Sequence, residues 1–351
     1  MIPVFDGHND ILLRLLHAAP QTRDALWLHG DGKGHLDLAR MRQGGFAGGF
    51  FAIYILSPHT GLDYDRLMDS PPYDLPLPEA IEAAAALPTA LAMAGILLRM
   101  ERVSAGGFKV CRSLAEIRQC LANGIVAGIM HMEGAEAIGA DLDALHAFHA
   151  MGLRSIGPVW SRPTIFGHGV PFRFPGSPDT GPGLTDAGKA LVRVCNALKI
   201  MIDLSHITEA GFNDVAALSD APLVATHSNA HAITASTRNL TDRQLAMIRQ
   251  TGGMVGLNFA TVFLRPDGRQ SADMDWDAVL RHTDHLISHL GEDHVGFGSD
   301  FDGATVPSGI TDVAGLPNLI DALRAHGYND AVLRKLACDN WVALLERTWG
   351  A

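Results

Sequence analysis

Residues 3–10 read PVFDGHND, a short apolar run around a glycine that ends on His8 and Asp10. Runs of this kind recur along the chain and are separated by longer segments with helical spacing. The predicted strands cover residues 3–8, 46–55, 125–132, 153–159, 199–205, 222–226, 253–259 and 294–299. Apolar strands that alternate with helices predict a parallel sheet covered by helices, and eight such units favour a closed (β/α)8 barrel of the TIM type. The alternative is an open doubly wound α/β sheet, but no GxGxxG follows the first strand.

Helical patterns fill most of the gaps between these strands. They cover residues 79–102, 113–122, 141–150, 185–198, 241–250, 275–290 and 329–347. Thr185 and Thr241 each precede an acidic residue and an apolar-periodic run, as helix N-caps do. Two connections rich in proline, glycine and aromatics, at about 57–78 and 161–184, follow the second and fourth strands. We expect these inserted loops on the active-site face of a single domain that covers residues 1–351.

The composition limits the classes of function. The chain has 351 residues, is 47% hydrophobic and has a net charge of -11, which disfavours nucleic-acid binding and polybasic membrane binding. No uninterrupted apolar run approaches the roughly 18 residues of a membrane span. Because the site residues begin within ten positions of Met1, which leaves no room for a signal peptide, we expect a cytoplasmic protein. The cysteines form no CxxC motif, which indicates buried free thiols.

Ionisable residues recur where the predicted strands end. They are His8, Asp10, Glu133, His206, His227 and Asp300. Catalytic groups of barrel enzymes converge from the carboxyl ends of separate strands. His8 and Asp10 are two residues apart on a strand, so both side chains can face the barrel mouth and bind one ion. Alone, this spacing would indicate capping or core hydrogen bonding, but the other strand ends favour a metal.

A second metal is predicted from the middle of the chain. Glu133 follows a run too apolar to leave a carboxylate unpaired, so it needs a metal or a buried salt bridge. His206 and His227 supply neutral imidazoles, a common zinc ligand, and with a bridging carboxylate they would complete the second site. Two metals about 3.5–4 Å apart can share a hydroxide, lower its pKa and polarise a carbonyl. His131 is expected to support a neighbouring ligand.

Two further residues have candidate roles in catalysis and binding. Asp300, at the last strand, can take the proton from the bridging water and pass it to a leaving amine, whereas Asp302 faces the opposite side of an extended segment. Arg238 could pair with a substrate carboxylate through its planar guanidinium. A solvated or backbone-bonding role is the alternative for Arg238.

The motifs DGHND, MEG, IDLSH, ATHSNA, RN and GSDFDG, in this order, resemble those of the membrane (renal-type) dipeptidase family among the amidohydrolase-like barrels. The resemblance covers about residues 4–347 and implies a binuclear zinc peptidase that hydrolyses dipeptides, often with tolerance for a C-terminal D-residue. It also suggests a homodimer.

The resemblance also implies a role for each matched residue. His8 and Asp10 would bind one Zn²⁺ and Glu133 would bridge to the second. His206 and His227 would bind that second Zn²⁺. Asp300 would be the acid/base, and Arg238 would receive the C-terminal carboxylate of the dipeptide.

Two positions depart from the family pattern. Trp160, in IGPVW, stands where renal-type members carry a histidine that helps to hold the substrate, and Ala260 stands where they carry a tyrosine. Trp160 can donate one hydrogen bond and stack, but it cannot carry a proton, so we predict a substrate contact only. Arg162 or His168 could replace the missing histidine. The alternative function is therefore a related amide hydrolase that acts on N-acyl-amino acids or lactams, and a non-catalytic barrel is disfavoured because every ligand position is intact.

Overall fold

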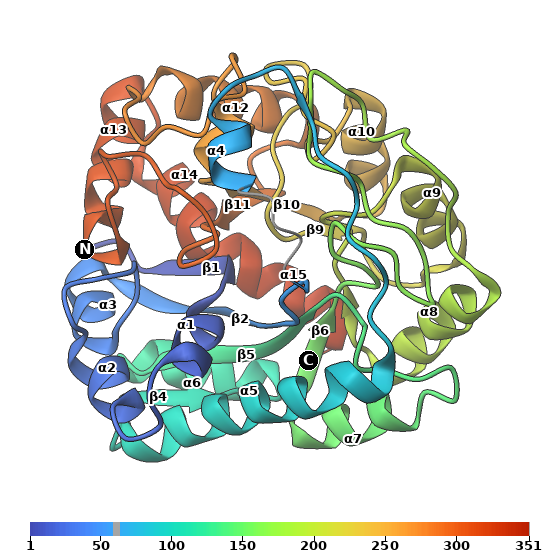
Figure 1. Cartoon of the computed structure of the whole chain (residues 1–351). Helices are drawn as coiled ribbons and strands as arrows, with labels where there is room; N and C mark the ends of the chain where they lie inside the picture. The colour runs from blue at the N-terminus through green and yellow to red at the C-terminus, as the bar shows by residue number, and fades with distance from the viewer. Residues whose placement is uncertain (59–63, 351) are drawn as a thin grey trace.

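The computed structural model describes residues 1–58 and 64–350 and contains all eight predicted strands. They are β1 Val4–Asn9, β2 Phe46–Tyr54, β5 Val126–Glu133, β6 Leu153–Ile156, β8 Met201–Ile202, β9 Val224–Ala225, β10 Met254–Asn258 and β11 Val295–Gly298. The strands pair in parallel in the order β8-β6-β5-β2-β1-β11-β10-β9. A parallel bridge between Asp203 and Val224 links the two ends of this path. The predicted TIM-type barrel is confirmed (Figure 1).

Helices surround the ring of strands (Figure 1). The predicted ones are α5 Ala83–Val103, α6 Leu114–Asn123, α7 Asp143–Met151, α8 Asp186–Leu198, α10 Asp242–Gln250, α12 Asp277–Leu290, α14 Asp330–Arg334 and α15 Asn340–Trp349. Other helices, which the sequence patterns did not predict, include α1 Ile11–His17, α2 Arg23–His29, α3 Leu38–Gly44, α9 Glu209–Leu218 and α13 Leu316–His326. Both predicted N-caps are confirmed, since the side chains of Thr185 and Thr241 accept hydrogen bonds from backbone N–H groups of their helices.

The floor of the barrel is closed by Trp341 of α15. An added Cβ on Gly7 would lie 2.5 Å from the Trp341 ring, so glycine is required for this close approach. The indole N–H of Trp341 donates to the carbonyl oxygen of Phe297 (3.0 Å), and the Asn340 amide donates to that of Val295 (2.7 Å), at the start of β11. Because α15 fills the amino ends of the strands, the opposite end of the barrel is the one left for a site.

The two long connections meet above the barrel mouth. β3 (Tyr73–Asp74) in the first connection pairs antiparallel with β7 (Arg173–Phe174) in the second. The Tyr73 and Phe174 rings also lie together, with centroids 6.2 Å apart. Met68 of the first connection and Phe172 of the second line the same cavity as Glu133, the last residue of β5, which confirms the expected position of both connections on the strand-end face for their described parts. Residues 59–63 of the first connection lie outside the described residues.

Helix α5 is relevant to the expectation that no segment of the chain spans a membrane. It is the one helix in the described chain that is long and apolar enough to cross a membrane by length and composition. In the structure α5 packs along the barrel and buries one face, which includes Ala90, Met93 and Leu97, as a core helix does. The expectation of a cytoplasmic protein without membrane contact stays a prediction.

Candidate active site

Glu133, the last residue of β5, lies at the centre of a buried cluster of imidazoles and carboxylates. Its Oε1 is 3.0 Å from His206 Nε2 and 3.5 Å from His227 Nε2. Its Oε2 is 3.5 Å from His8 Nε2, which in turn is 3.3 Å from Asp10 Oδ2. Each oxygen of Glu133 therefore faces a different group of donor atoms, as a carboxylate between two cations would.

The backbone at two strand ends is turned to bring side chains into this cluster. His206 has φ 70° and Asp300 has φ 59°, both in the left-handed region that non-glycine residues seldom adopt. Such conformations cost free energy and persist where the surrounding structure enforces them, which is common at functional sites. Both residues line the same cavity at the barrel mouth.

Hydrogen bonds at Nδ1 orient the rings of His206 and His227. His206 Nδ1 is 2.8 Å from Ser161 Oγ, and His227 Nδ1 is 2.8 Å from Thr226 Oγ1. Both Nε2 atoms then face Glu133 and lie 3.1 Å from each other. Burial lowers the pKa of both histidines well below the ordinary value, so each ring is neutral and can offer a lone pair.

The environment of His8 fits a bound cation. The side chain is fully buried, and neither ring nitrogen has a hydrogen-bond partner within the described parts of the chain. Burial raises the pKa of Glu133 to about 7, because nothing nearby fully compensates its charge. Buried polar groups without partners are costly, and a divalent metal would satisfy His8 and Glu133 together. Imidazoles with carboxylates are a donor set that suits zinc and related metals.

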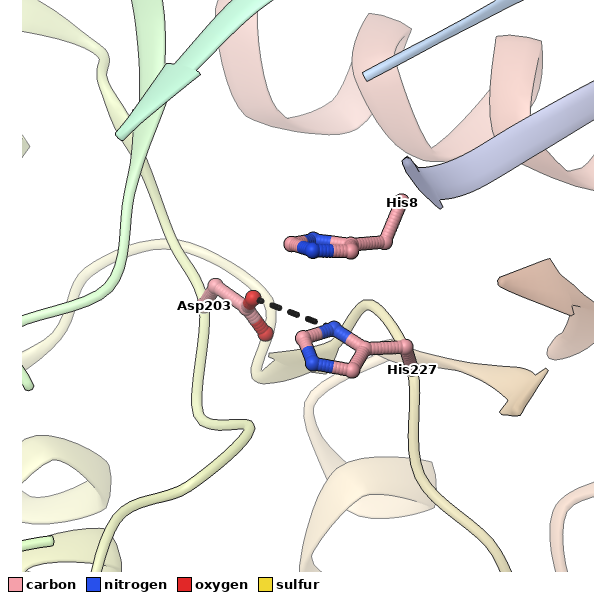
Figure 2. Close-up of side chains that lie close together, drawn as sticks. All are labelled: His8, Asp203 and His227. Atoms are coloured by element: carbon pink, nitrogen blue, oxygen red, sulfur yellow. Dashed lines mark ion pairs between the residues drawn. The ribbon is translucent and has the colours of Figure 1, made fainter. Parts of the chain in front are cut away.

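Asp203, which directly follows β8, is a buried carboxylate beside the cluster that the sequence analysis did not single out. Its carboxylate accepts hydrogen bonds from the N–H of Ser205 (3.0 Å) and from the N–H and hydroxyl of Thr226 (2.8 and 2.5 Å). Its Oδ2 lies 3.9 Å from His227 Nδ1, the ion pair that Figure 2 marks with a dashed line, and 3.6 Å from His131 Nε2. Asp203 thus fixes Thr226, which in turn orients His227. Its position directly after an apolar strand was the feature of the sequence that could have identified it.

Asp300 and Arg238 both lie close to this cluster. The Asn258 amide donates to Asp300 Oδ2 (3.0 Å), and burial raises the pKa of Asp300. Arg238 is buried, its Nη2 donates to the His227 carbonyl (3.1 Å), and its Nε has no partner among the described residues. Burial lowers the pKa of Arg238 to about 10, which leaves it charged at neutral pH.

A cavity of about 860 Å³ opens above the cluster. The cavity is lined by four residues of the site, Asp10, Glu133, His206 and Asp300, and by several aromatic rings, namely Tyr54, Trp160, Phe172 and Phe263. Arg238 is absent from the described residues that line the cavity, but its guanidinium carbon lies 5.2 Å from the centroid of the Phe263 ring. The cavity can therefore hold a small molecule against the candidate metal ligands, with a cation directly behind the wall.

The model of the membrane dipeptidase family (peptidase family M19) matches residues 1–349. The chain belongs to this family. A metallo peptidase from Rhodobacter sphaeroides, liganded with a phosphinate mimic of the dipeptide L-Ala-D-Ala, is 71% identical with a TM-score of 0.98, and each chain is covered to 99%. The dipeptidase AC, also of family M19, is 71% identical with a TM-score of 0.98 over 100% of this chain and 99% of that chain. A Klebsiella pneumoniae protein, described as an uncharacterized protein in the pqqA 5′ region, is 51% identical over 254 residues, 72% of this chain and 94% of that protein.

Within this family member, the two departures lie in the cavity wall. The Trp160 ring lies 5.6 Å from His206 and 5.2 Å from Tyr54, measured between centroids, so the predicted contact with a substrate is geometrically available. Ala260 also lines the cavity. Arg162 cannot replace the missing histidine, because it is fully buried and pairs with Glu136 (2.7 Å). His168 is likewise outside the described lining of the cavity.

Gly303 provides a test of how closely this M19 centre is packed. An added Cβ would lie 2.2 Å from Asp10 Oδ2 and 2.7 Å from Asp300 Oδ1, so these carboxylates would have to move. We expect Gly303→Ala to weaken metal binding by about 10–100-fold, as changes that shift ligand orientation do. The measurement is metal content after dialysis against graded chelator concentrations. Gly95→Ala, on an exposed face of α5 with open space around the Cβ, is the control, and equal metal affinity in both variants would contradict the expectation.

Proposed function

We propose that this chain is a metal-dependent dipeptidase that uses two Zn²⁺ ions and accepts dipeptides with a C-terminal D-residue. The observation that carries the proposal is the placement of Glu133, whose two oxygens face His206 and His227 on one side and His8, beside Asp10, on the other. Membership of the M19 family supports the dipeptidase activity. The phosphinate mimic of L-Ala-D-Ala in the 71% identical R. sphaeroides metallo peptidase supports the substrate class.

Five residues of the chain are the proposed metal ligands. His8 and Asp10 would hold one metal, His206 and His227 the other, and Glu133 both. Bound metals of this kind lower the pKa of a water molecule and polarise a carbonyl.

The remaining residues handle the proton and the substrate. Asp300, whose pKa is raised by burial, is suited to take up a proton and to deliver it to the leaving amine. Asn258 holds the Asp300 carboxylate in place. The aromatic rings that line the cavity, Trp160 among them, would exclude water around a bound substrate.

Arg238→Ala tests the proposed binding of the substrate carboxylate. The unpartnered Nε–H of Arg238 is a buried donor next to the cavity wall, and a carboxylate would satisfy it. Loss of one partner of a buried charge pair costs about 2–5 kcal/mol, so we expect KM to rise by about 30-fold or more. Steady-state kinetics on a free dipeptide and on its C-terminal amide would measure this. An unchanged KM for the free dipeptide would reject the assignment.

A panel of L-X-L-X and L-X-D-X dipeptides, assayed on zinc-loaded protein, tests the function itself. We expect turnover of free dipeptides, and no turnover of any of them with metal confirmed in the protein would reject the proposal. N-acylated dipeptides and N-acyl-D-amino acids belong in the same panel, because the replacement of the family histidine by Trp160 allows a different substrate. Hydrolysis that needs no free α-amine would favour the amide hydrolase alternative. The expected homodimer stays a prediction that sedimentation velocity would test.

A further inference from the structure

A second cluster of potential metal ligands lies on the outer surface, between α10 and α12. His285 and His289 are one helical turn apart on α12, and their rings stack with centroids 4.2 Å apart at 23°. Asp242, the first residue of α10, faces both rings. Its Oδ1 lies 2.7 Å from His285 Nε2, and its Oδ2 lies 3.7 Å from His289 Nε2. One ligand atom from each residue lies within 4.8 Å of the others.

This geometry suits a single divalent metal. Two histidines four residues apart on one helix face present both imidazoles to one zinc ion, and a carboxylate is a common third ligand. Donor atoms around tetrahedral zinc stand about 3.3 Å apart, since each bond is about 2 Å long. The distances from Asp242 Oδ1 to His285 Nε2 (2.7 Å) and from Asp242 Oδ2 to His289 Nε2 (3.7 Å) lie on either side of that value. Small rotations of these partly exposed side chains would therefore complete the site.

The hydrogen bonds of His289 point to the same conclusion. Its Nδ1 lies 2.9 Å from the carbonyl oxygen of His285 and 3.0 Å from Ser288 Oγ. With the proton held at Nδ1 by that carbonyl, Nε2 keeps its lone pair and faces Asp242. Histidines that bind metals are supported by backbone carbonyls in this way.

A simple ion pair explains less of this arrangement. An ion pair between Asp242 and His285 (2.7 Å) gives no reason for the second ring, whose Nε2 faces the other oxygen of Asp242 at 3.7 Å. We propose that Asp242, His285 and His289 bind a further divalent transition metal of the zinc type. The side chains are 52%, 19% and 34% exposed, so water can fill the remaining coordination position.

Such a site would tie together two helices of the outer ring. Residue 242 begins α10 and residues 285 and 289 lie on α12, so the ion would link segments more than forty residues apart. The unfolded chain does not bring these ligands together, and binding to the folded state therefore stabilises it. The site is distinct from the barrel mouth, because none of the three residues is among the described residues that line the cavity.

Zinc titration of the holoenzyme tests this site. Zinc-loaded wild type and the double variant His285→Gln/His289→Gln are dialysed to equilibrium against graded Zn²⁺, and bound metal is measured by elemental analysis. We expect the wild type to bind one equivalent more than the double variant. We also expect a Zn²⁺-dependent rise in Tm that is smaller in the variant, with the same kcat/KM for dipeptides in both proteins. Asp242→Asn, which keeps both rings, is expected to weaken the extra equivalent.

His326→Gln is the matched control, because His326 is a surface histidine that pairs with one carboxylate, Asp284 (2.9 Å). We expect this variant to keep the extra equivalent. Equal zinc content in the wild type and the double variant would overturn the proposal. That result is separate from failure of the proposed function, which would show as absence of dipeptide turnover in both proteins.

Discussion

Asp300→Asn is expected to lower kcat for dipeptides by about 10²–10⁴-fold, the usual contribution of general acid–base catalysis. Asparagine keeps the size of the side chain and can keep the contact with Asn258, but it cannot take up or deliver a proton. If Asp300 transfers the proton, the metal content and KM should stay close to those of the wild type. Elemental analysis and steady-state kinetics on the same preparation measure both quantities.

Loss of metal from Asp300→Asn would also be informative, because Asp300 lies close to the candidate metal ligands. Donor atoms of His8, Asp10 and Asp300 lie within 4.8 Å of one another, so Asp300 is close enough to be a third ligand of one metal. Loss of metal from Asp300→Asn would identify it as a ligand and remove the acid/base assignment. Asp302→Asn is the matched control, since Asp302 has a similar φ of 65° and accepts its hydrogen bond from the His35 backbone (2.6 Å). We expect a much smaller loss of kcat in that variant.

The barrel could be predicted because its eight strands are buried on both faces and read as apolar runs in the sequence. The helices α1, α2 and α3 could not, since each is seven residues long and too short to show a clear helical period. The pairing of β3 with β7 was also beyond the sequence, because it joins two-residue strands about one hundred residues apart. Such contacts depend on where the barrel places the two connections.

Some residues of the candidate site could likewise be predicted from the sequence, and others could not. Its ligand candidates could be predicted because each lies at or just after the carboxyl end of a strand, and these ends converge in a barrel. The roles of Asp203 and Ser161 could not, because they act through hydrogen bonds to Thr226 and His206 that only the folded chain brings together. Arg162 was offered a functional role that the structure does not support. A cation in the loop after the fourth predicted strand suggested a contact with substrate, but the fold uses it to neutralise the buried Glu136.

Glu133→Gln is expected to have the largest effect, with loss of bound metal and a fall in turnover of more than about 10⁴-fold. The carboxylate faces both groups of donor atoms, so its removal weakens both at once. Metal ions contribute several kcal/mol of transition-state stabilisation, and each 1.36 kcal/mol is about tenfold in rate. Glu133→Asp keeps the charge on a shorter side chain, and we expect it to retain part of the metal and of the activity.

The Tm of Glu133→Gln, measured with and without metal, distinguishes a metal-binding role of Glu133 from a purely structural one. In the absence of metal, burial raises the pKa of Glu133 to about 7, although the neighbouring His8 offsets part of that rise. A neutral glutamine removes the cost of burying this charge but also removes a carboxylate that raises the pKa of the buried His8, so metal-free Glu133→Gln should unfold at a Tm close to that of the metal-free wild type. Added Zn²⁺ should then raise the Tm of the wild type well above that of the variant. A metal-free variant that is much less stable than the metal-free wild type would instead indicate that Glu133 supports the fold through its ion pairs with the histidines.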